Sequence, residues 1–343
     1  MMRGPQVSVI IPCRNEVRYI GDCLESLLAN DYPKDRVELL VVDGMSDDGT
    51  RDVVRQYSRM HPSTQLVDNP RNVTPAALNI GIERACGSVI MLMGAHAACP
   101  PTYISHLVTW LQQSGADGVG GLCVARPGRD SATAKAIAAA LSHPFGVGNS
   151  YFRTGVRAPR WVDTVPFGCY RRDVFERVGL FDEQLVRDQD DEFNMRLLKQ
   201  GGRLLLVPTI ASHYFARESL GKLWRMFFQY GYFKPLVVRK VGGIMTGRQL
   251  MPAALVVGLV LAGLLAPWLD AARLLFGLAL GAYGAATLAV AASIARRGGV
   301  LVGVAASAVF PVLHFAYGLG YVRGVFDFLV RGKRPVLAVP LSR

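Results

Sequence analysis

Three long runs without a charged residue dominate the second half of this 343-residue chain. They cover residues 250–269, 274–295 and 298–322, and spanning a hydrocarbon core takes about 20 mostly apolar residues. Buried helices of a soluble bundle are the alternative, but such helices carry a polar stripe and these runs have none. We therefore expect an integral, multi-pass membrane protein with about three transmembrane helices. Pro311 and His314 make the third run the least regular, which leaves a re-entrant segment open.

The charges are divided unevenly between the two parts of the chain. Residues 1–215 contain 23 basic and 23 acidic side chains, whereas residues 216–343 contain 15 basic and 3 acidic ones, which accounts for the whole net charge of +12. Because this excess coincides with the apolar runs, it indicates anionic membrane lipids as a partner, and no nucleic acid. The six cysteines form no CxxC pair, so we expect reduced thiols and neither a disulfide framework nor a zinc site.

Strand and helix patterns alternate through the first part of the chain. This alternation predicts a parallel, doubly wound α/β sheet of Rossmann character, whose strand carboxyl ends meet at one crevice. Neither GxGxxG nor GxxxxGK[ST] is present, which argues against a dinucleotide oxidoreductase and a P-loop NTPase. The expected strands are 7–11, 37–42, 64–68, 88–93, 115–125 and 203–207, the expected helices are 17–28, 51–61, 75–86, 172–178 and 192–200, and residues 127–160 are expected to be partly loop.

These patterns predict four parts of the chain. They are a catalytic domain at 1–215, an amphipathic interfacial helix with a linker at 216–248, transmembrane helices at 249–322 and a basic tail at 323–343. Apolar residues between 220 and 228 recur at helical spacing with basic residues on the other faces, which favours a helix lying at the lipid surface. A helix packed on the catalytic domain is the alternative.

The sidedness of the tail is left open by the sequence. The chain begins directly with a strand pattern and has no apolar leader, so we expect the first domain to lie in the cytosol. Three crossings would then place the basic tail outside, against the positive-inside bias.

Several motifs resemble the family 2 glycosyltransferases with the GT-A fold. They occur in the family's order at residues 7–16 (VSVIIPCRNE), 39–50 (LLVVDGMSDDGT) and 69–82 (NPRNVTPAALNIGI), and the resemblance continues through 168–172, 179–183 and 190–197. It covers about residues 5–235 and is greatest to the succinoglycan-type, membrane-anchored exopolysaccharide enzymes. The resemblance implies a GT-A catalytic domain followed by an interfacial helix and a C-terminal α-helical transmembrane region.

The resemblance also implies a binding site for a nucleotide sugar. Asp43 would accept hydrogen bonds from the nucleobase or ribose, and the loop after the first strand would line the nucleoside. For each of these residues the alternative is an ordinary turn or helix cap. The residues implied in donor binding are Pro12, Arg14, Asn15, Glu16, Asp43, Asn72 and Arg217.

Asp190 is the expected catalytic residue. An inverting transfer needs one carboxylate to deprotonate the acceptor hydroxyl, and the family places it in a short acidic motif that opens a helix. The first position of that motif is usually Glu and is Gln189 here, and Asp188 lies close enough in sequence to be confused with the base. Stabilisation of the helix dipole is the alternative role of such a cluster. The residues implied on the acceptor side are Gly168, Arg172 and Asp191.

The expected metal site departs from the family pattern. Relatives carry Asp-x-Asp or Asp-x-His after the third long strand, whereas this chain has Gly94-Ala95-His96. His96 and, further on, His213 are the expected ligands, and imidazole favours Mn²⁺ over Mg²⁺. Arg217 and Lys222 would supplement the positive charge at the leaving diphosphate.

The expected function is transfer of a sugar from a nucleotide sugar such as UDP-hexose to a lipid-linked saccharide, at the cytosolic face of a bacterial plasma membrane. A polyprenyl-phosphate glycosyltransferase is the alternative within the class. A processive synthase is disfavoured because residues 229–233 lack the Arg-Trp of its Gln-x-x-Arg-Trp motif. A degenerate membrane scaffold is the alternative from another class, motivated by Gly94. The sequence indicates no oligomeric state.

Overall fold

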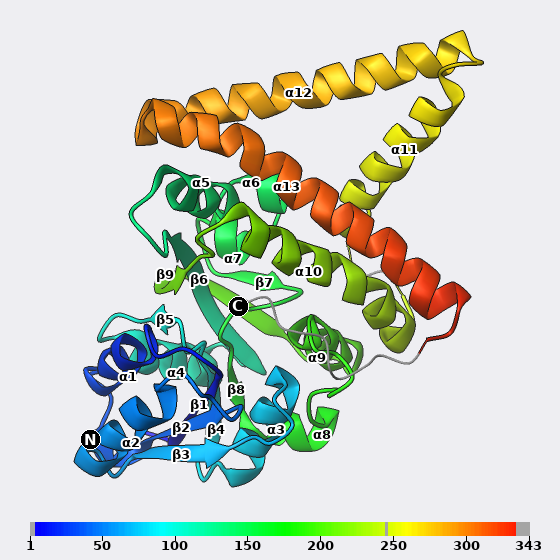
Figure 1. Ribbon diagram of the computed structural model, residues 1–343. Helices are drawn as coiled ribbons and strands as arrows, with labels where there is room; N and C mark the ends of the chain where they lie inside the picture. Colours follow the sequence, from blue (N-terminus) through cyan, green and yellow to red (C-terminus); the bar gives the residue numbers. More distant parts are fainter. Residues whose placement is uncertain (1–3, 244–245, 334–343) are drawn as a thin grey trace. The chain divides into compact units, whose positions relative to one another are not determined.

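The computed structural model describes residues 4–243 and 246–333, which form two compact units (Figure 1). The first unit comprises the described residues up to 124 together with 151–214, and the second comprises 125–150 and the described residues from 215 onward. The four-part division expected from the sequence stays a prediction.

The first unit is built on a mixed β-sheet. Its strands follow the order β3-β2-β1-β4-β8-β6-β9-β5, and β7 pairs with β9. The neighbours among β1, β2, β3 and β4 are parallel, as the sequence predicted, whereas β8 pairs antiparallel with β4 and β6, and β9 antiparallel with β5 and β7. The strands are β1 Val7–Cys13, β2 Val37–Asp43, β3 Thr64–Asp68, β4 Val89–Leu92, β5 Ala97–Ala98, β6 Gly118–Arg126, β7 Arg160–Val162, β8 Cys169–Arg171 and β9 Leu204–Phe215.

Helices cover both faces of this sheet. Successive side chains of a strand point to opposite faces, so Val9 and Ile11 pack in one core with α1 and α4, and Ile10 packs in another with α3, α8 and α9. The architecture is therefore the expected layered α/β one. The helices of this unit are α1 Ile20–Leu28, η1 Lys34–Arg36, α2 Thr50–Met60, α3 Thr74–Arg84, α4 Tyr103–Gln113, α7 Tyr151–Thr154, α8 Arg172–Val178 and α9 Gln189–Lys199.

The sheet register brings three loops to one edge. β1 and β2 run in step, so that Cys13 lies opposite Asp43, and β4 pairs with the other side of β1. The segments that leave β1, β2 and β4 at their carboxyl ends therefore start next to one another. This edge carries most of the residues that the sequence analysis assigned to the donor site.

One strand differs from the sequence expectation, and one segment is more closely defined than the sequence allowed. β9 continues to Phe215, whereas the apolar run alone predicted an end at Val207, because pairing with β5 extends the strand beyond its apolar part. Residues 127–160, which were expected to be partly loop, contain the three helices α5 Ala132–Leu141, α6 Pro144–Val147 and α7 with loop segments between them.

The second unit is helical. Residues 247–265, 270–298 and 300–330 are each long and apolar enough to cross a membrane. Pro311 lies inside α13 without ending it, so the irregularity expected in the third run is absent from this helix. Besides α5 and α6, the helices are α10 Leu220–Val241, η2 Gly247–Gln249, α11 Met251–Leu265, α12 Asp270–Gly298, α13 Val300–Gly324 and the π-helical segment η3 Val325–Val330.

Candidate functional site

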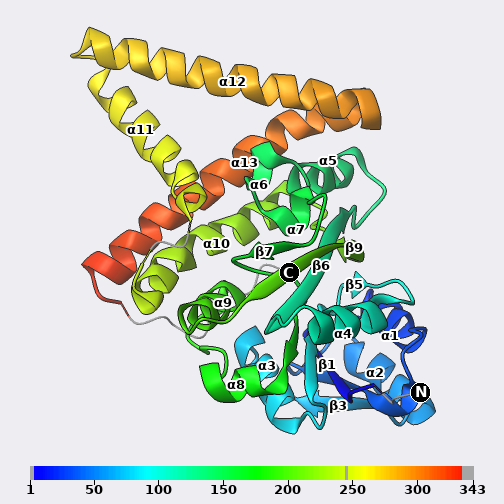
Figure 2. The same cartoon turned by 180° about the vertical axis from the view of Figure 1, so that it is seen from behind.

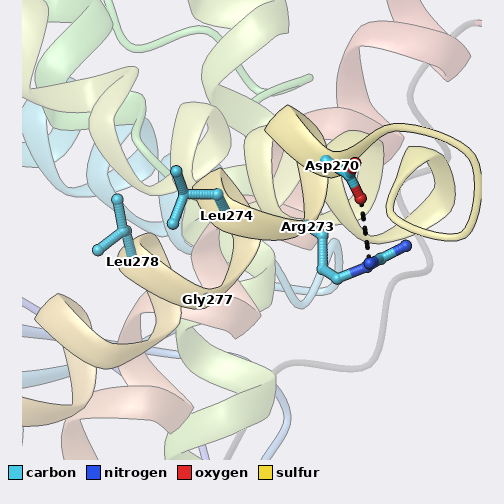
Figure 3. Close-up of a pocket in the computed structure, with 5 residues that line it drawn as sticks. All are labelled: Asp270, Arg273, Leu274, Gly277 and Leu278. Carbon is cyan, nitrogen blue, oxygen red and sulfur yellow. Dashed lines mark ion pairs between the residues drawn. The ribbon is translucent and has the colours of Figure 1, made fainter.

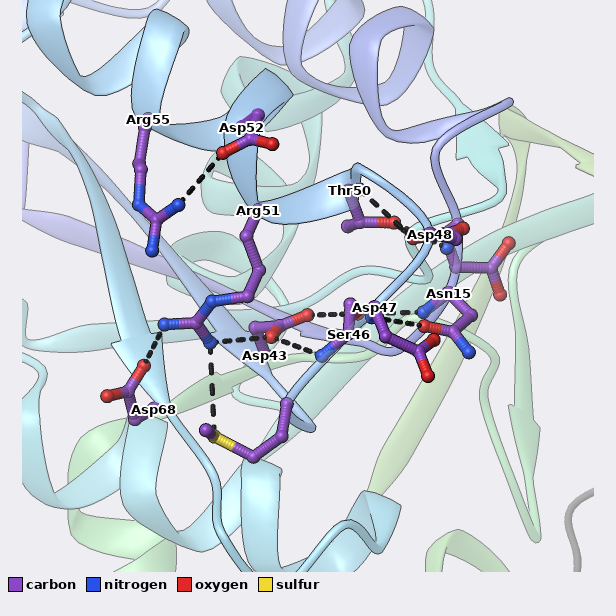
Figure 4. Close-up of polar contacts among 12 residues, drawn as sticks. Asn15, Asp43, Ser46, Asp47, Asp48, Thr50, Arg51, Asp52, Arg55 and Asp68 are labelled. Carbon is purple, nitrogen blue, oxygen red and sulfur yellow. Dashed lines mark hydrogen bonds and ion pairs between the residues drawn. The ribbon is translucent and has the colours of Figure 1, made fainter.

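The loops that follow β1 and β2 are hydrogen-bonded to each other (Figure 4). The main-chain N–H of Asn15 donates to Ser46 Oγ at 2.8 Å, and that of Asp47 donates to Asn15 Oδ1 at 3.1 Å. The N–H of Glu16 donates to Thr50 Oγ1 at 2.8 Å. Asn15 has a φ of 52°, in the left-handed region that Asn tolerates better than most residues. The two loops, residues 14–16 and 44–50, thus form one hydrogen-bonded platform.

Asp43 is fully buried beneath this platform. Its carboxylate accepts hydrogen bonds from the main-chain N–H of Ser46 at 2.9 Å and the Ser46 hydroxyl at 2.5 Å, and it pairs with Arg51 Nη1 at 2.8 Å. The same guanidinium pairs with Asp68 at 2.7 Å. Asp43 therefore orders the loop in this conformation, and because the residue is fully buried, a direct nucleobase contact requires neighbouring atoms to move.

Asn72 and Arg14 lie beside the same loop. Asn72 has a φ of 58°, and its side-chain amide nitrogen donates to the Gly44 carbonyl at 2.8 Å. Arg14 Nη1 donates to the main-chain oxygen of Asn72 at 3.4 Å. The side chain of Arg14 lies against Gly44, where a Cβ would be 3.3 Å from it. Pro12 stays within β1, opposite Val42.

His96, which follows β4, is paired with a buried carboxylate. Its Nδ1 lies 3.1 Å from Glu16 Oε1, and the Glu16 side chain is only 7% exposed. An ionised carboxylate only accepts hydrogen bonds, so it favours the proton on Nδ1 and leaves Nε2 with its lone pair. Among residues 4–243 and 246–333, no acceptor or donor pairs with Nε2. His96 also meets the ring of Tyr214 edge-on, with 5.1 Å between ring centroids.

Gly94 is packed against an aromatic ring. A Cβ at this position would lie 2.9 Å from a ring carbon of Phe167, a residue with a φ of 44°. A side chain at position 94 would therefore require Phe167 to move. Phe167 therefore occupies the space that the first Asp side chain of the family motif would need at position 94.

Arg153 contacts the same aromatic ring as His96, although no sequence pattern selected it. Its guanidinium carbon lies 5.5 Å from the ring centroid of Tyr214, the residue that His96 meets edge-on. Its Nη1 is buried and has no hydrogen-bond acceptor within the described part of the chain. The sequence did not point to Arg153 because Tyr214, the residue that it contacts, lies in the part of β9 beyond the apolar run. His213, the neighbouring residue, lies opposite Ala98 in the β5–β9 pairing.

The acidic cluster opens α9. Asp190 is exposed in the first turn, whereas Asp188 is buried at the N-cap with a φ of 60°. Glu192 is buried and pairs with Arg196 at 2.6 Å, so it has a structural partner. Burial, and after it the negative charge of Asp190, raises the pKa of Tyr170, which places Asp190 within electrostatic range of that buried ring.

The remaining residues predicted for the site lie in different elements of the structure. Arg172 donates to the main-chain oxygens of Gly87 (2.8 Å) and Ala85, which precede β4 at the opposite edge of the sheet from His96. Gly168 is required by packing, because a Cβ there would overlap the Tyr170 ring. Asp191 is half-buried in the first turn of α9, and Arg217 belongs to the second unit, where its Nε is buried.

The side chains around His96 supply only part of what a metal site needs. No group of three or more His, Cys, Asp or Glu side chains is arranged to hold an ion within residues 4–243 and 246–333. His96 with its Glu16 partner nevertheless matches the arrangement in which a carboxylate orients a histidine ligand.

A surface hollow on α12 is unrelated to this site (Figure 3). One helix of the second unit supplies its whole lining, and Asp270 and Arg273 form an ion pair there at 3.1 Å. None of the residues that the sequence analysis assigned to donor, acceptor or metal lines this hollow.

Comparisons with known proteins identify the family and the fold of this chain. Residues 8–179 match the family described as Glycosyl transferase family 2. A dolichyl N-acetyl-alpha-D-glucosaminyl phosphate 3-beta-D-2,3-diacetamido-2,3-dideoxy-beta-D-glucuronosyltransferase of Methanococcus voltae is 31% identical over 68% of this chain and 74% of its own length. The succinoglycan biosynthesis protein ExoA of Rhizobium meliloti is 29% identical over 93% of this chain and 95% of its own. The fold is similar to that of the mannosyltransferase PcManGT from Pyrobaculum calidifontis, solved with GDP-Man and Mn²⁺, with a TM-score of 0.59 and 22% identity over 95% of this chain and 88% of that one. The chain belongs to glycosyltransferase family 2 and has the GT-A fold of a nucleotide-sugar glycosyltransferase.

Proposed function

We propose that this protein transfers a sugar from a nucleotide sugar to a lipid-linked saccharide at the cytosolic face of a membrane, with inversion at the anomeric carbon. The observation that carries the donor half of the proposal is the Glu16–His96 pair beside the platform of residues 14–16 and 44–50. The acceptor half is supported by the three apolar helices and by the relative from Methanococcus voltae, whose name gives a dolichyl sugar phosphate.

Asp190 is the proposed general base. Asp190 is exposed in the first turn of α9, whereas Glu192 is buried and pairs with Arg196. In the transfer, the acceptor oxygen bonds to the anomeric carbon and its proton passes to Asp190. The bond from that carbon to the diphosphate oxygen breaks, and the nucleoside diphosphate leaves with the electron pair.

Three residues are proposed to act on the diphosphate. His96 would hold a divalent ion, which supplies positive charge to the leaving group, and Glu16 fixes the orientation of its ring. Arg153 would donate from its buried Nη1 to a diphosphate oxygen, since a charged, planar donor of this kind suits phosphate. Mn²⁺ is favoured because His96, and His213 if it also binds the ion, offer imidazole nitrogens.

A calorimetric titration tests the donor site. The purified full chain is titrated with UDP and with GDP, each with Mn²⁺ and with EDTA. We expect one nucleotide to bind and its affinity to fall when EDTA removes the ion. Binding of neither nucleotide would contradict the proposed function and favour the scaffold alternative.

Arg153→Met separates the diphosphate contact from binding of the nucleoside. Loss of one hydrogen bond to a charged group costs about 1.5–3 kcal/mol, or roughly 10–100-fold in affinity. We expect this loss for the nucleoside diphosphate and no comparable loss for the free nucleoside. Arg157→Met, an exposed arginine four residues further on, is the matched control. Equal affinities of the two variants would remove Arg153 from the site.

A further inference from the structure

The third apolar helix, α13, has one exposed and one buried face. At about 100° per residue, its large exposed side chains fall within about a third of the helix circumference. Such a stripe along a helix that is packed on its other side is typical of a helix at a boundary, with protein on one side and an apolar medium on the other. The exposed side chains are Val300, Leu301, Val304, Leu319 and Val322, and the buried ones include Val302, Ala306, Val309, Phe310, Leu313, Ala316 and Gly320. Gly318 lies on the exposed side of the helix but is buried, because α11 crosses there and a Cβ at this position would overlap the main chain at Pro252. The exposed stripe therefore consists of two stretches, one on either side of this crossing.

The buried face of α13 packs along α10, and both views show the two helices side by side (Figures 1 and 2). A Cβ on Gly231 would overlap the main chain at Tyr317, and one on Gly324 would overlap the main chain at Tyr232. Close approach through glycines is the packing mode of helices whose backbones touch. Residue numbers rise together along the two helices, so α10 runs parallel to the C-terminal half of α13.

The buried carboxylate of Asp327 holds the end of α13 and the segment η3 against α10. Asp327 is 2% exposed; its Oδ2 accepts a hydrogen bond from Tyr232 at 3.1 Å and pairs with Arg323 at 3.0 Å. Lys333 pairs with its other oxygen at 3.2 Å. Arg239 of α10 donates to the main-chain oxygen of Phe328 at 2.8 Å. The chain from 323 to 333 is thereby fixed next to α10.

α10 must lie on the same side of a membrane as the first unit. Only residues 215–219 separate its start from Tyr214, the last residue of that unit. Even fully extended, this link reaches at most about 22 Å, less than the roughly 30 Å of a hydrocarbon core. α10 also carries five basic residues, which are costly to bury in lipid. These are Lys222, Arg225, Lys234, Arg239 and Lys240.

The middle of α13 contacts a second segment that is tied to the first unit. His314 Nε2 lies 2.7 Å from the main-chain oxygen of Phe145 in α6, and the rings of Phe145 and Phe310 meet edge-on at 5.1 Å. α6 ends at Val147, and the first unit resumes at Tyr151. Two separate parts of α13 are therefore held by segments that a short link keeps on the side of the first unit.

We propose that α11 and α12 are the membrane-crossing pair and that α13 lies along the leaflet on the side of the first unit. Its exposed stripe then contacts lipid acyl chains, and its buried face carries α10. The chain crosses twice, so the basic residues Arg331 and Lys333 stay on the side of the catalytic unit, in agreement with the positive-inside bias. This inference does not depend on which sugar or acceptor is used.

Cysteine accessibility tests the sidedness. In a Cys86→Ser background, which removes the exposed native thiol among the six cysteines, Trp268→Cys marks the α11–α12 connection and Arg331→Cys marks the end of η3. In intact bacterial cells that express the full chain, a membrane-impermeant maleimide should label position 268 and leave 331 unlabelled until the cells are permeabilised. Labelling of position 331 in intact cells, or failure to label 268, would overturn the proposal.

Depth measurements test the orientation of α13. Spin labels replace Leu301, Leu319 and Leu329 in the purified full chain in phosphatidylcholine–phosphatidylglycerol vesicles. A helix in the plane of the leaflet gives three similar depths, whereas a crossing helix spreads these positions over about 42 Å. Leu274, Leu280 and Leu288 of α12 are the matched controls, with the greatest depth expected at 280. A graded depth along α13, or dipolar broadening that shows a second copy on the stripe, would contradict the proposal.

Discussion

Arg51→Met should destabilise the first unit through the buried carboxylate of Asp43. In the native chain, Asp43 is fully buried and is balanced by Arg51 Nη1 at 2.8 Å and by two hydrogen bonds from Ser46. The substitution keeps an apolar side chain of similar length and removes the positive charge. Asp43 then remains buried with the two Ser46 donors alone.

The expected loss of folding stability follows from how deeply the Arg51–Asp43 ion pair is buried. Breaking a buried ion pair by removing one partner costs about 3–5 kcal/mol. The Arg51 side chain is 18% exposed, and Ser46 still donates, so we expect the smaller loss of about 2–3 kcal/mol that is typical of a charged hydrogen bond. For a unit of this size, 1 kcal/mol shifts Tm by about 2–4 °C, which gives a fall of about 4–12 °C.

Thermal unfolding of the purified full chain, followed by tryptophan fluorescence, measures this shift. Trp110 of α4 packs against the core of the first unit and reports on its unfolding. Arg55→Met is the matched control, because Arg55 lies on the same helix and its ion pair with Asp52 is exposed on both sides. Surface pairs of this kind contribute about 0–1 kcal/mol.

A double variant tests whether the two residues act through each other. If Asp43→Asn relieves the uncompensated charge, the double variant loses less stability than the sum of the two single variants. A Tm of Arg51→Met equal to that of Arg55→Met, or additive losses in the double variant, would refute the reasoning.

Three further predictions concern catalysis, acid stability and helix packing. Asp190→Asn should lower turnover by about 10²–10⁴-fold and leave nucleotide affinity unchanged, as measured by transfer of labelled sugar and by calorimetry; retained turnover would remove Asp190 as the base. Partial burial alone would raise the pKa of Asp117, but hydrogen bonds from Arg177 and from a neighbouring main-chain amide outweigh it and hold that pKa below its usual value. The ionised Asp117 carboxylate therefore stabilises the fold above its unfolded pKa, and this stabilisation is lost as the pH falls through its folded pKa. The Tm difference between wild type and Asp117→Asn should shrink below about pH 4. A difference that stays constant with pH would refute the role of Asp117. Gly231→Val should destabilise the chain by at least about 1–3 kcal/mol, because the main chain of α13 occupies the space of its side chain, whereas Gly243→Val meets no atom within 4 Å and should have a much smaller effect in the same thermal assay.

The position of the site edge was predictable because it depends on local patterns. Alternating strand and helix signals located β1, β2, β3 and β4 within a few residues, and parallel pairing then places their carboxyl ends together. The residues at or just after those ends, including Asp43 and His96, could be selected without coordinates. The lengths of the three apolar helices were also set by composition.

The partners within the site were not predictable. Glu16 and His96 are 80 residues apart in sequence, and no local pattern joins them. Arg153 was missed because β9 was expected to end at Val207, and the continuation to Tyr214 depends on pairing with β5 rather than on its own apolar content. Arg172 is a further case, because no local pattern pairs its guanidinium with the carbonyls that precede β4.

The sequence by itself determined the elements, because helix and strand periodicity and the absence of charge are properties of neighbouring residues. It also determined that part of the chain is apolar enough to enter a membrane. Only the tertiary structure decided which polar groups meet and which side of an apolar helix is covered. Tyr232 and Asp327 are 95 residues apart, yet their contact fixes the end of α13 beside α10. Such contacts depend on the path of the whole chain. A buried charge is costly without a partner, and the path of the chain decides which residue lies close enough to be that partner.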